Sequence, residues 1–416
     1  MKKLIYVSTR LPWPTDSGRK VTLYNYCKGL HELFGFEVYL YSFLDSDQAF
    51  AKDDTPSFIK DVVLAKKVGG LTVLKNLLWA LVRGRPLQEA LFQSRENQKN
   101  LKSFLKSVSP DVVIVDMIRL APYVSTIDEQ SNALKVLDID DLLSKRYLRQ
   151  IAKGASRHAL GTSAKGVSGA SLLKASSLLS DIVLKREAKA LERAEIEYSR
   201  MFDKVFFVSE KEARAFAEEN HFDHVFSAGM GVDVDFYSED VPIDRNSSDL
   251  SFVGNMAYGP NIESVEFIGN EILPLIKHDV CLKVVGPCDD VARATLGSLK
   301  RVQLLGRLDD LRGAVRATSL YVAPISYGSG IKTKILEAMA MGMCVLTNEV
   351  GAEGISARRG IDYFVEDDPR SMAVLIDELL DDPPRVQEVG NNARRYVDAN
   401  CRWDHILQGF SALCGR

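Results

Sequence analysis

The sequence lacks the patterns that mark several classes of protein. Its six cysteines contain no CxxC pair and its six histidines no HExxH pattern, so neither a zinc site nor a disulfide framework is indicated. The net charge of −3 over 416 residues indicates neither a nucleic-acid coat nor an acidic tail. No apolar run reaches the roughly 18 residues that a membrane-spanning helix requires. What remains is a globular composition, 46% hydrophobic, with ample length for two cores.

The first residues, MKKLIYVSTRLPW, have only a short apolar run before Arg10. This pattern predicts a first β-strand and not a signal peptide. We therefore expect a cytoplasmic protein, and leave open whether it lies peripherally on the inner face of the cell membrane.

Short β-branched runs alternate with helical patterns along most of the chain, which predicts buried parallel strands. The first series comprises 3–8, 36–43, 111–116, 134–139 and 204–209, and the second 250–253, 281–285, 302–305, 320–323 and 344–347. We expect an α/β protein of two doubly wound, Rossmann-like domains with a ligand cleft between them. The predicted domains are 1–238 and 250–400, joined by a polar linker at 239–249. A C-terminal helix over 401–416 completes the second domain or crosses back to the first.

Two regions depart from this alternation. Residues 71–87 form an apolar helix with Trp79 and basic flanks, and residues 144–186 contain nine Lys or Arg against one acid, Asp181. One interpretation is a core helix and a solvated helical surface. The other is docking on an anionic membrane surface or a lipid-phosphate acceptor.

The stretch YGSGIKTKILEAMAMG, residues 327–342, places two lysines where a helix is expected to begin, at Ile331. A helix N-terminus favours anions, so Lys332 and Lys334 need a negative partner there. Gly328 and Gly330 allow the backbone to approach a ligand closely. A diphosphate would satisfy both the free N–H groups and Lys334.

Glu337 shares a helix face with Lys334 and is the single charged residue between Ile335 and Leu346. A carboxylate in apolar surroundings needs hydrogen-bond donors. The hydroxyls of a ribose would provide them. The alternative is an ordinary ion pair between Lys334 and Glu337, worth about 0.2–0.5 kcal/mol.

Several motifs resemble those of GT-B glycosyltransferases, especially glycosyltransferase family 4. They are GSGIKTKILEAMAMGMCVLTNEVGAEGI (328–355), FVGNMAYGPN (252–261), VVGP (284–287), LGRLDDL (305–311), FDKVFFVSEKEA (202–213) and the glycine loop LPWPTDSGRK (11–20). The resemblance spans most of the chain and is strongest in the second domain. It implies the GT-B fold and transfer of a sugar from a nucleotide-diphosphate donor, UDP- or GDP-linked, to a glycan or lipid-linked acceptor in cell-surface polysaccharide biosynthesis.

The resemblance also implies roles for particular residues. Glu337 matches the family glutamate that holds the donor ribose, whereas Ser329 replaces the first glutamate of that pair. The family often grips the diphosphate with an Arg and a Lys after the first strand of the second domain, and GNMAYGPN has neither. The implied donor-binding residues are Gly18, Arg307, Gly328, Ser329, Gly330, Ile331, Lys332, Lys334 and Glu337.

Relatives with this signature retain the anomeric configuration and need neither an enzyme nucleophile nor a bound metal. We therefore expect no cofactor. The charge that develops on the departing diphosphate must be stabilised, a role for Lys334. Asp116 and Asp140 end predicted strands and are candidates to orient the acceptor hydroxyl.

Other interpretations remain. DIDD (138–141) contains a DxD, which holds a metal ion in another glycosyltransferase fold. GMGVDVD (229–235) and GSGIKT (328–333) both lack the third glycine of GxGxxG, which disfavours a nicotinamide dehydrogenase. A GT-B sugar-nucleotide epimerase and a catalytically dead glycan-binding protein are the alternatives to a glycosyltransferase.

Overall fold

The computed structural model describes residues 1–15, 18–44, 50–128, 131–152, 177–239, 248–328 and 330–414. The chain forms two compact units, Met1–Gly229 with Ile406–Arg416, and Met230–His405. Residues 230–238 of the first predicted domain thus lie in unit 2. Residues 240–247, most of the predicted linker, and 153–176, most of the basic segment, lie outside the described residues.

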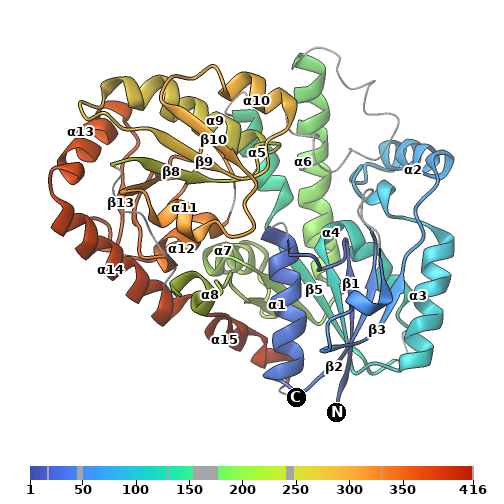
Figure 1. Cartoon of the computed structure of the whole chain (residues 1–416). Coiled ribbons are helices and arrows are strands. Elements are labelled where there is room, and N and C mark those ends of the chain that lie inside the picture. The colour runs from blue at the N-terminus through green and yellow to red at the C-terminus, as the bar shows by residue number, and fades with distance from the viewer. Residues whose placement is uncertain are drawn as a thin grey trace. The chain divides into compact units, whose positions relative to one another are not determined.

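Unit 1 is built on a parallel sheet of seven strands in the order β3-β2-β1-β4-β5-β6-β7 (Figure 1). The strands are β1 (Lys3–Ser8), β2 (Glu37–Ser42), β3 (Ile59–Leu64), β4 (Val112–Asp116), β5 (Leu134–Asp140), β6 (Lys204–Phe207) and β7 (Val225–Ser227). The helices are α1 (Gly18–Glu32), α2 (Gly70–Arg83), α3 (Arg95–Val108), α4 (Met117–Leu120), α5 (Leu143–Ala152), α6 (Ser177–Ser199) and α7 (Glu210–Asn220), with short 3-10 turns η1 (Lys52–Asp54), η2 (Glu89–Leu91), η3 (Ala121–Thr126) and η8 (Leu407–Leu413).

Unit 2 repeats this plan with six parallel strands in the order β10-β9-β8-β11-β12-β13. The strands are β8 (Leu250–Val253), β9 (Leu282–Val285), β10 (Val302–Gly306), β11 (Leu320–Ala323), β12 (Cys344–Thr347) and β13 (Phe364–Val365). The helices are α8 (Val234–Ser238), α9 (Gly259–Phe267), α10 (Asp290–Leu296), α11 (Arg312–Arg316), α12 (Thr333–Ala340), α13 (Pro369–Leu380) and α14 (Pro383–Asn400), with a π turn η6 (Ile268–Ile272) and a 3-10 turn η7 (Leu273–Leu275). Each unit encloses its own apolar core.

The prediction of two doubly wound α/β domains is confirmed. The ten predicted strands are present, with ends shifted by at most two residues, while the sequence analysis missed β3, β7 and β13. The C-terminal segment is not one helix, because α14 ends at Asn400 and is followed by α15 (Trp403–Ile406) and η8. Phe410 of η8 packs its ring against Tyr26 of α1, with the ring centroids 4.8 Å apart.

Of the two interpretations of residues 71–87, the core helix does not hold for most of α2. Only Val73 and Ala80 of this helix are buried. Its opposite face is apolar and exposed, and comprises Leu71, Leu74, Leu78, Trp79, Leu81 and Val82. The sequence could not reveal this, because apolar side chains on both sides of a helix give the same pattern as a buried helix.

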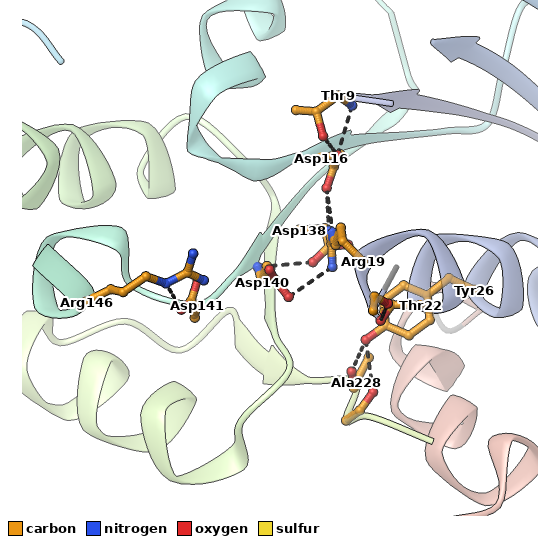
Figure 2. Close-up of polar contacts among 12 residues, drawn as sticks. Thr9, Arg19, Thr22, Tyr26, Asp116, Asp138, Asp140, Asp141, Arg146 and Ala228 are labelled. Atoms are coloured by element: carbon orange, nitrogen blue, oxygen red, sulfur yellow. Dashed lines mark hydrogen bonds and ion pairs between the residues drawn. The ribbon is translucent and has the colours of Figure 1, made fainter. Parts of the chain in front are cut away.

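Arg19 joins α1 to the carboxyl ends of two central strands of unit 1 (Figure 2). Its guanidinium forms ion pairs with Asp116, at the end of β4, and with Asp138 and Asp140, near the carboxyl end of β5. Thr9 donates from its N–H to Asp116 at 2.9 Å, and Tyr6 donates its hydroxyl to Asp138 at 2.5 Å. A cation in the first turn of a helix opposes the helix dipole, so these carboxylates supply the partner that Arg19 needs.

Replacing Arg19 with methionine leaves three neighbouring carboxylates without their cation. We expect the free energy of unfolding at pH 7 to fall by about 3–5 kcal/mol, because buried charges then lack compensation. In the variant the three carboxylates repel one another, so their pKa values in the folded state rise above those in the unfolded chain. Protonation relieves that repulsion, and the deficit shrinks as pH falls toward 4. Urea unfolding between pH 4 and 8 measures it.

Arg214→Met is the matched control, because Arg214 is exposed and forms an ion pair with Glu210 on its own helix. We expect a change within about 0.5 kcal/mol. An Arg19→Met deficit that is small, or that stays constant across this pH range, would show that the carboxylates do not depend on Arg19.

Candidate functional site

The predicted donor site of unit 2 lies where its strand order reverses. β8 and β11 are neighbours in the sheet, and the chain turns away to opposite sides after them. Ligands of doubly wound sheets bind outside the carboxyl ends of the strands at such a point. The loop after β8 leads to α9 and the loop after β11 leads to α12, which carries the two lysines.

Helix α12 begins at Thr333, two residues later than predicted. Ile331 and Lys332 therefore precede the helix, and Lys332 is its N-cap residue without a capping side-chain bond. Gly330 has a φ of 68°, a conformation that favours glycine and that turns the chain into the helix. Gly328 is likewise at positive φ, and Ser329 lies outside the described residues. The expected loop–helix junction is thus present, with a later start.

Lys334 points back toward the loop after β8. Its ammonium group donates a hydrogen bond to the side-chain oxygen of Asn261 in α9 and lies 4.8 Å from the ring centroid of Phe252 in β8. Burial lowers the pKa of Lys334 to about 7, Glu337 opposes this shift, and Lys332 adds to it. Within the described residues no carboxylate lies within ion-pair distance of this ammonium group. Its contacts there are the neutral amide of Asn261 and the ring of Phe252.

Glu337 lies one turn further along α12 and bonds with the hydroxyl of Tyr237 from α8. Burial raises the pKa of Glu337, whereas Tyr237 and Lys334 lower it. Burial raises the pKa of Tyr237, and the nearby carboxylate of Glu337 raises it further. Both Lys334 and Glu337 remain partly accessible to solvent, so a ligand can reach them.

Lys332 occupies a different environment from Lys334. Its ammonium group donates to the carbonyl of Gly330 at 2.5 Å and lies 3.9 Å from Glu353. Arg307 is exposed directly after β10, at the edge of the sheet, and β9 and β8 separate that strand from β11. The structure therefore groups Gly328 and residues 330–334 with Glu337, and does not place Arg307 with them.

The other predicted residues lie in unit 1. Gly18 is the first residue of α1, beside Arg19, and Asp116 and Asp140 both contact that arginine. Burial would raise the pKa of Asp116, but Arg19 and Thr9 outweigh it and lower that pKa. Burial raises the pKa of Asp140 to about 6 despite Arg19, and Asp141 and Asp138 raise it as well. The side chain of Asp140 is 20% exposed, whereas that of Asp116 is fully buried.

Sequence reasoning missed four residues of these sites: Asn261, Phe252, Tyr237 and Arg19. Three of them stand inside stretches that it had selected, FVGNMAYGPN and LPWPTDSGRK. A signal was therefore present for Asn261, Phe252 and Arg19, although their partners depend on strands that are distant in the sequence. Nothing in the sequence marked Tyr237.

Comparison with known proteins agrees with this geometry. Residues 247–382 match the family described as "Glycosyl transferases group 1". The chain is 20% identical over 420 residues to an "Uncharacterized 44.6 kDa protein in cps region" of Klebsiella pneumoniae, with 96% of each chain covered. It is 28% identical over 203 residues to a phosphatidyl-myo-inositol mannosyltransferase of Mycobacterium tuberculosis, covering 44% of this chain and 53% of that protein.

Solved structures with the same arrangement of elements include sucrose-phosphate synthase from Thermosynechococcus elongatus, with a TM-score of 0.68 and 15% identity over 100% of this chain and 98% of that one. HepE from Anabaena, solved in complex with UDP and glucose, has a TM-score of 0.65 and 13% identity over 100% and 99%. Within the described ranges no helix is long and apolar enough to cross a membrane. The chain has the GT-B fold, and its residues 247–382 match the group 1 glycosyltransferases.

Proposed function

We propose that this glycosyltransferase moves a sugar from a nucleotide-diphosphate donor to a glycan or lipid-linked acceptor, with retention of configuration, in cell-surface polysaccharide biosynthesis. The donor is a UDP- or GDP-sugar. Its diphosphate binds at the N-terminus of α12 beside Lys334, and its ribose binds Glu337.

One observation carries the proposal: the ammonium group of Lys334 has neutral partners at a helix N-terminus. Asn261 fixes its position without neutralising it, and Phe252 lies against it. The N-terminal N–H groups of α12 add positive potential at the same place. An anion is the partner that this arrangement favours, and a departing diphosphate gains the same stabilisation as its charge develops.

The relatives support a nucleotide-sugar donor and a surface-polysaccharide context. HepE binds UDP and glucose, the mycobacterial relative is a mannosyltransferase of a phospholipid, and the Klebsiella relative is encoded in a cps region. These names differ in sugar and acceptor. They support the class of donor and leave the sugar open.

Of the two aspartates predicted near the acceptor, Asp140 suits that role better. Asp116 is fully buried, and its oxygens accept from Thr9 and Arg19. Asp140 accepts from Arg19 through Oδ1 at 3.1 Å and is partly exposed. A carboxylate whose pKa is about 6 is also a stronger proton acceptor than an ordinary aspartate. We assign Asp140 to orienting the acceptor hydroxyl, and Asp116 to holding Arg19.

We also propose that unit 1 docks on an anionic membrane surface through the exposed apolar face of α2. Leu71 and Val82 are more than four-fifths exposed, and Trp79 stacks with Arg83, whose guanidinium carbon lies 5.8 Å from the ring centroid. The helix carries Lys75 and Arg83 and no acidic residue. Apolar insertion combined with basic side chains is typical of helices that lie in a membrane interface.

The donor assignment predicts unequal effects along one helix. Glu337→Ala and Lys334→Ala should each weaken binding of a UDP- or GDP-sugar by about tenfold or more, because each removes a charged hydrogen-bond partner. Lys332→Ala should weaken it less than about threefold, because its ammonium group is bound to Gly330 within the loop. Calorimetry measures these affinities. Equal, mild effects in all three variants would defeat the assignment. If the protein epimerises or hydrolyses the donor when no acceptor is present, the epimerase is favoured instead.

The low pKa of Lys334 predicts that donor affinity depends on pH. Lys334 is cationic below about pH 7 and loses its proton above it, so affinity for a UDP-sugar should fall by up to about tenfold per pH unit above that point. The diphosphate diester keeps a constant charge in this range. Lys334→Arg should flatten the profile because arginine stays protonated, whereas Lys332→Arg should not. An unchanged slope in Lys334→Arg would contradict the prediction.

Membrane docking predicts binding to vesicles that contain phosphatidylglycerol. Leu74→Glu with Leu78→Glu should reduce co-sedimentation by about tenfold or more, because two charges then oppose insertion. Val374→Glu is the matched control, since Val374 is a similarly exposed apolar residue on helix α13 of unit 2. If the unaltered protein ignores these vesicles at low salt, or the control loses binding equally, α2 is not the docking element.

A further inference from the structure

Three arginines follow three neighbouring strands of unit 1. Arg10 stands two residues after β1, Arg119 lies in α4 directly after β4, and Arg146 lies in α5 after β5. β1 pairs with β4 through Val7 opposite Val115, and β4 pairs with β5 through Asp116 opposite Asp138. Because parallel strands end at the same edge of a sheet, the three arginines are brought to one place. That place is the reversal of strand order between β1 and β4.

The carboxylates at this edge are already bound by other arginines. Arg19 holds Asp116, Asp138 and Asp140, and Arg146 donates from Nε to Asp141 at 2.8 Å (Figure 2). Arg10 and Arg119 form no ion pair with a carboxylate among the described residues. The Nε–H of each is buried from solvent and has no hydrogen-bond partner there.

The burial of Arg119 makes this lack of a partner costly. Arg119 lies in α4, the first turn after β4, and only 7% of the residue is exposed to solvent. Burial lowers the pKa of Arg119, and Arg10 and Arg146 lower it further, whereas Tyr147 and Asp116 raise it. Burial and the neighbouring guanidinium groups of Arg10 and Arg146 therefore all disfavour the charge on Arg119. A buried charge without a partner is unfavourable, and an anionic ligand would offset that cost.

Phosphate oxygens suit this pair of side chains best. A guanidinium presents N–H groups in a planar fork that matches the spacing of phosphate oxygens, and two forks from adjacent strands match a dianion. A single acidic sugar would satisfy only one of them. We propose that Arg10 and Arg119 bind a phosphate group carried by the acceptor. The assignment to the acceptor rests on the proposed function, which places the donor diphosphate at α12 of unit 2.

The phosphate can belong to a soluble sugar phosphate or to a lipid-linked phosphate, since both are phosphate esters. The test uses a Lys334→Ala background, in which the proposed donor site is impaired. Calorimetry measures the binding of inorganic pyrophosphate, glucose 1-phosphate and a short polyprenyl monophosphate in detergent micelles, with empty micelles as a blank. Arg10→Gln and Arg119→Gln should each weaken binding of at least one phosphate ester by about tenfold, as expected for loss of a charge-assisted hydrogen bond.

Arg214→Gln, on the exposed face of α7, is the control and should leave binding unchanged. Because Arg119→Gln alters a buried position, its melting temperature is measured as well, and the half-buried Arg10→Gln provides an independent variant. Arg119→Lys keeps the charge without the fork and should give an intermediate affinity. Preference for glucose 1-phosphate identifies a sugar phosphate as the ligand, and preference for the polyprenyl ester identifies a lipid-linked one.

No binding of any phosphate ester, or binding that Arg10→Gln and Arg119→Gln leave unchanged, would overturn the proposal. Equal loss of UDP-sugar affinity in Arg10→Gln, measured with Lys334 intact, would also overturn it by assigning these arginines to the donor. Failure of the proposed function looks different. In that case UDP- and GDP-sugars would not bind the unaltered protein, while the arginine-dependent binding of a phosphate ester would persist.

Discussion

A cation in the first turn of a helix needs an anion, and this constraint applies in both units. Arg19 and Lys334 each stand in the first turn of a helix that follows the central strands of a parallel sheet. The positive end of the helix dipole makes that position unfavourable for either side chain. Unit 1 resolves the conflict within the fold, because three aspartates at the ends of β4 and β5 surround Arg19. Unit 2 provides Lys334 with an amide oxygen and an aromatic ring instead.

This difference separates a structural cation from a binding cation. The charge of Arg19 is already balanced, so a ligand anion there would compete with three carboxylates. Asn261 orients the ammonium group of Lys334, and no carboxylate among the described residues pairs with it. The proposed diphosphate would therefore meet a preorganised donor and displace no such carboxylate. Preorganised groups of this kind stabilise developing negative charge most effectively, because they need not reorient during the reaction. Arg10 and Arg119 of unit 1 also form no ion pair among the described residues, where Arg19 and Arg146 bind the carboxylates at the ends of β4 and β5.

The sequence predicted the features that depend on local pattern. Alternation of β-branched runs with helical segments gave the two-domain architecture, and the glycines with Lys334 and Glu337 marked the α12 junction, although its helix begins two residues later. It could not predict which side of α2 is buried, because both sides are apolar. Nor could it find Arg119, Arg10 or Tyr237. Among the described residues the Nε–H groups of Arg10 and Arg119 have no hydrogen-bond partner, and Tyr237 bonds with Glu337 of another helix. Such relations are fixed only when segments distant in sequence become neighbours.

The proposed roles divide between the units, and that division accounts for the extent of the family match. The match covers 247–382, which includes β8, α9, β11, α12 and hence Lys334, Asn261 and Glu337. Every donor of this class presents a ribose and a diphosphate, so the same groups suit many enzymes. Unit 1 carries the exposed face of α2, the partly exposed Asp140 and the pair formed by Arg10 and Arg119. Relatives whose acceptors differ in lipid, charge or glycan would need different side chains to bind them. A shared fold with a general donor site and a particular acceptor site is what these opposing demands require.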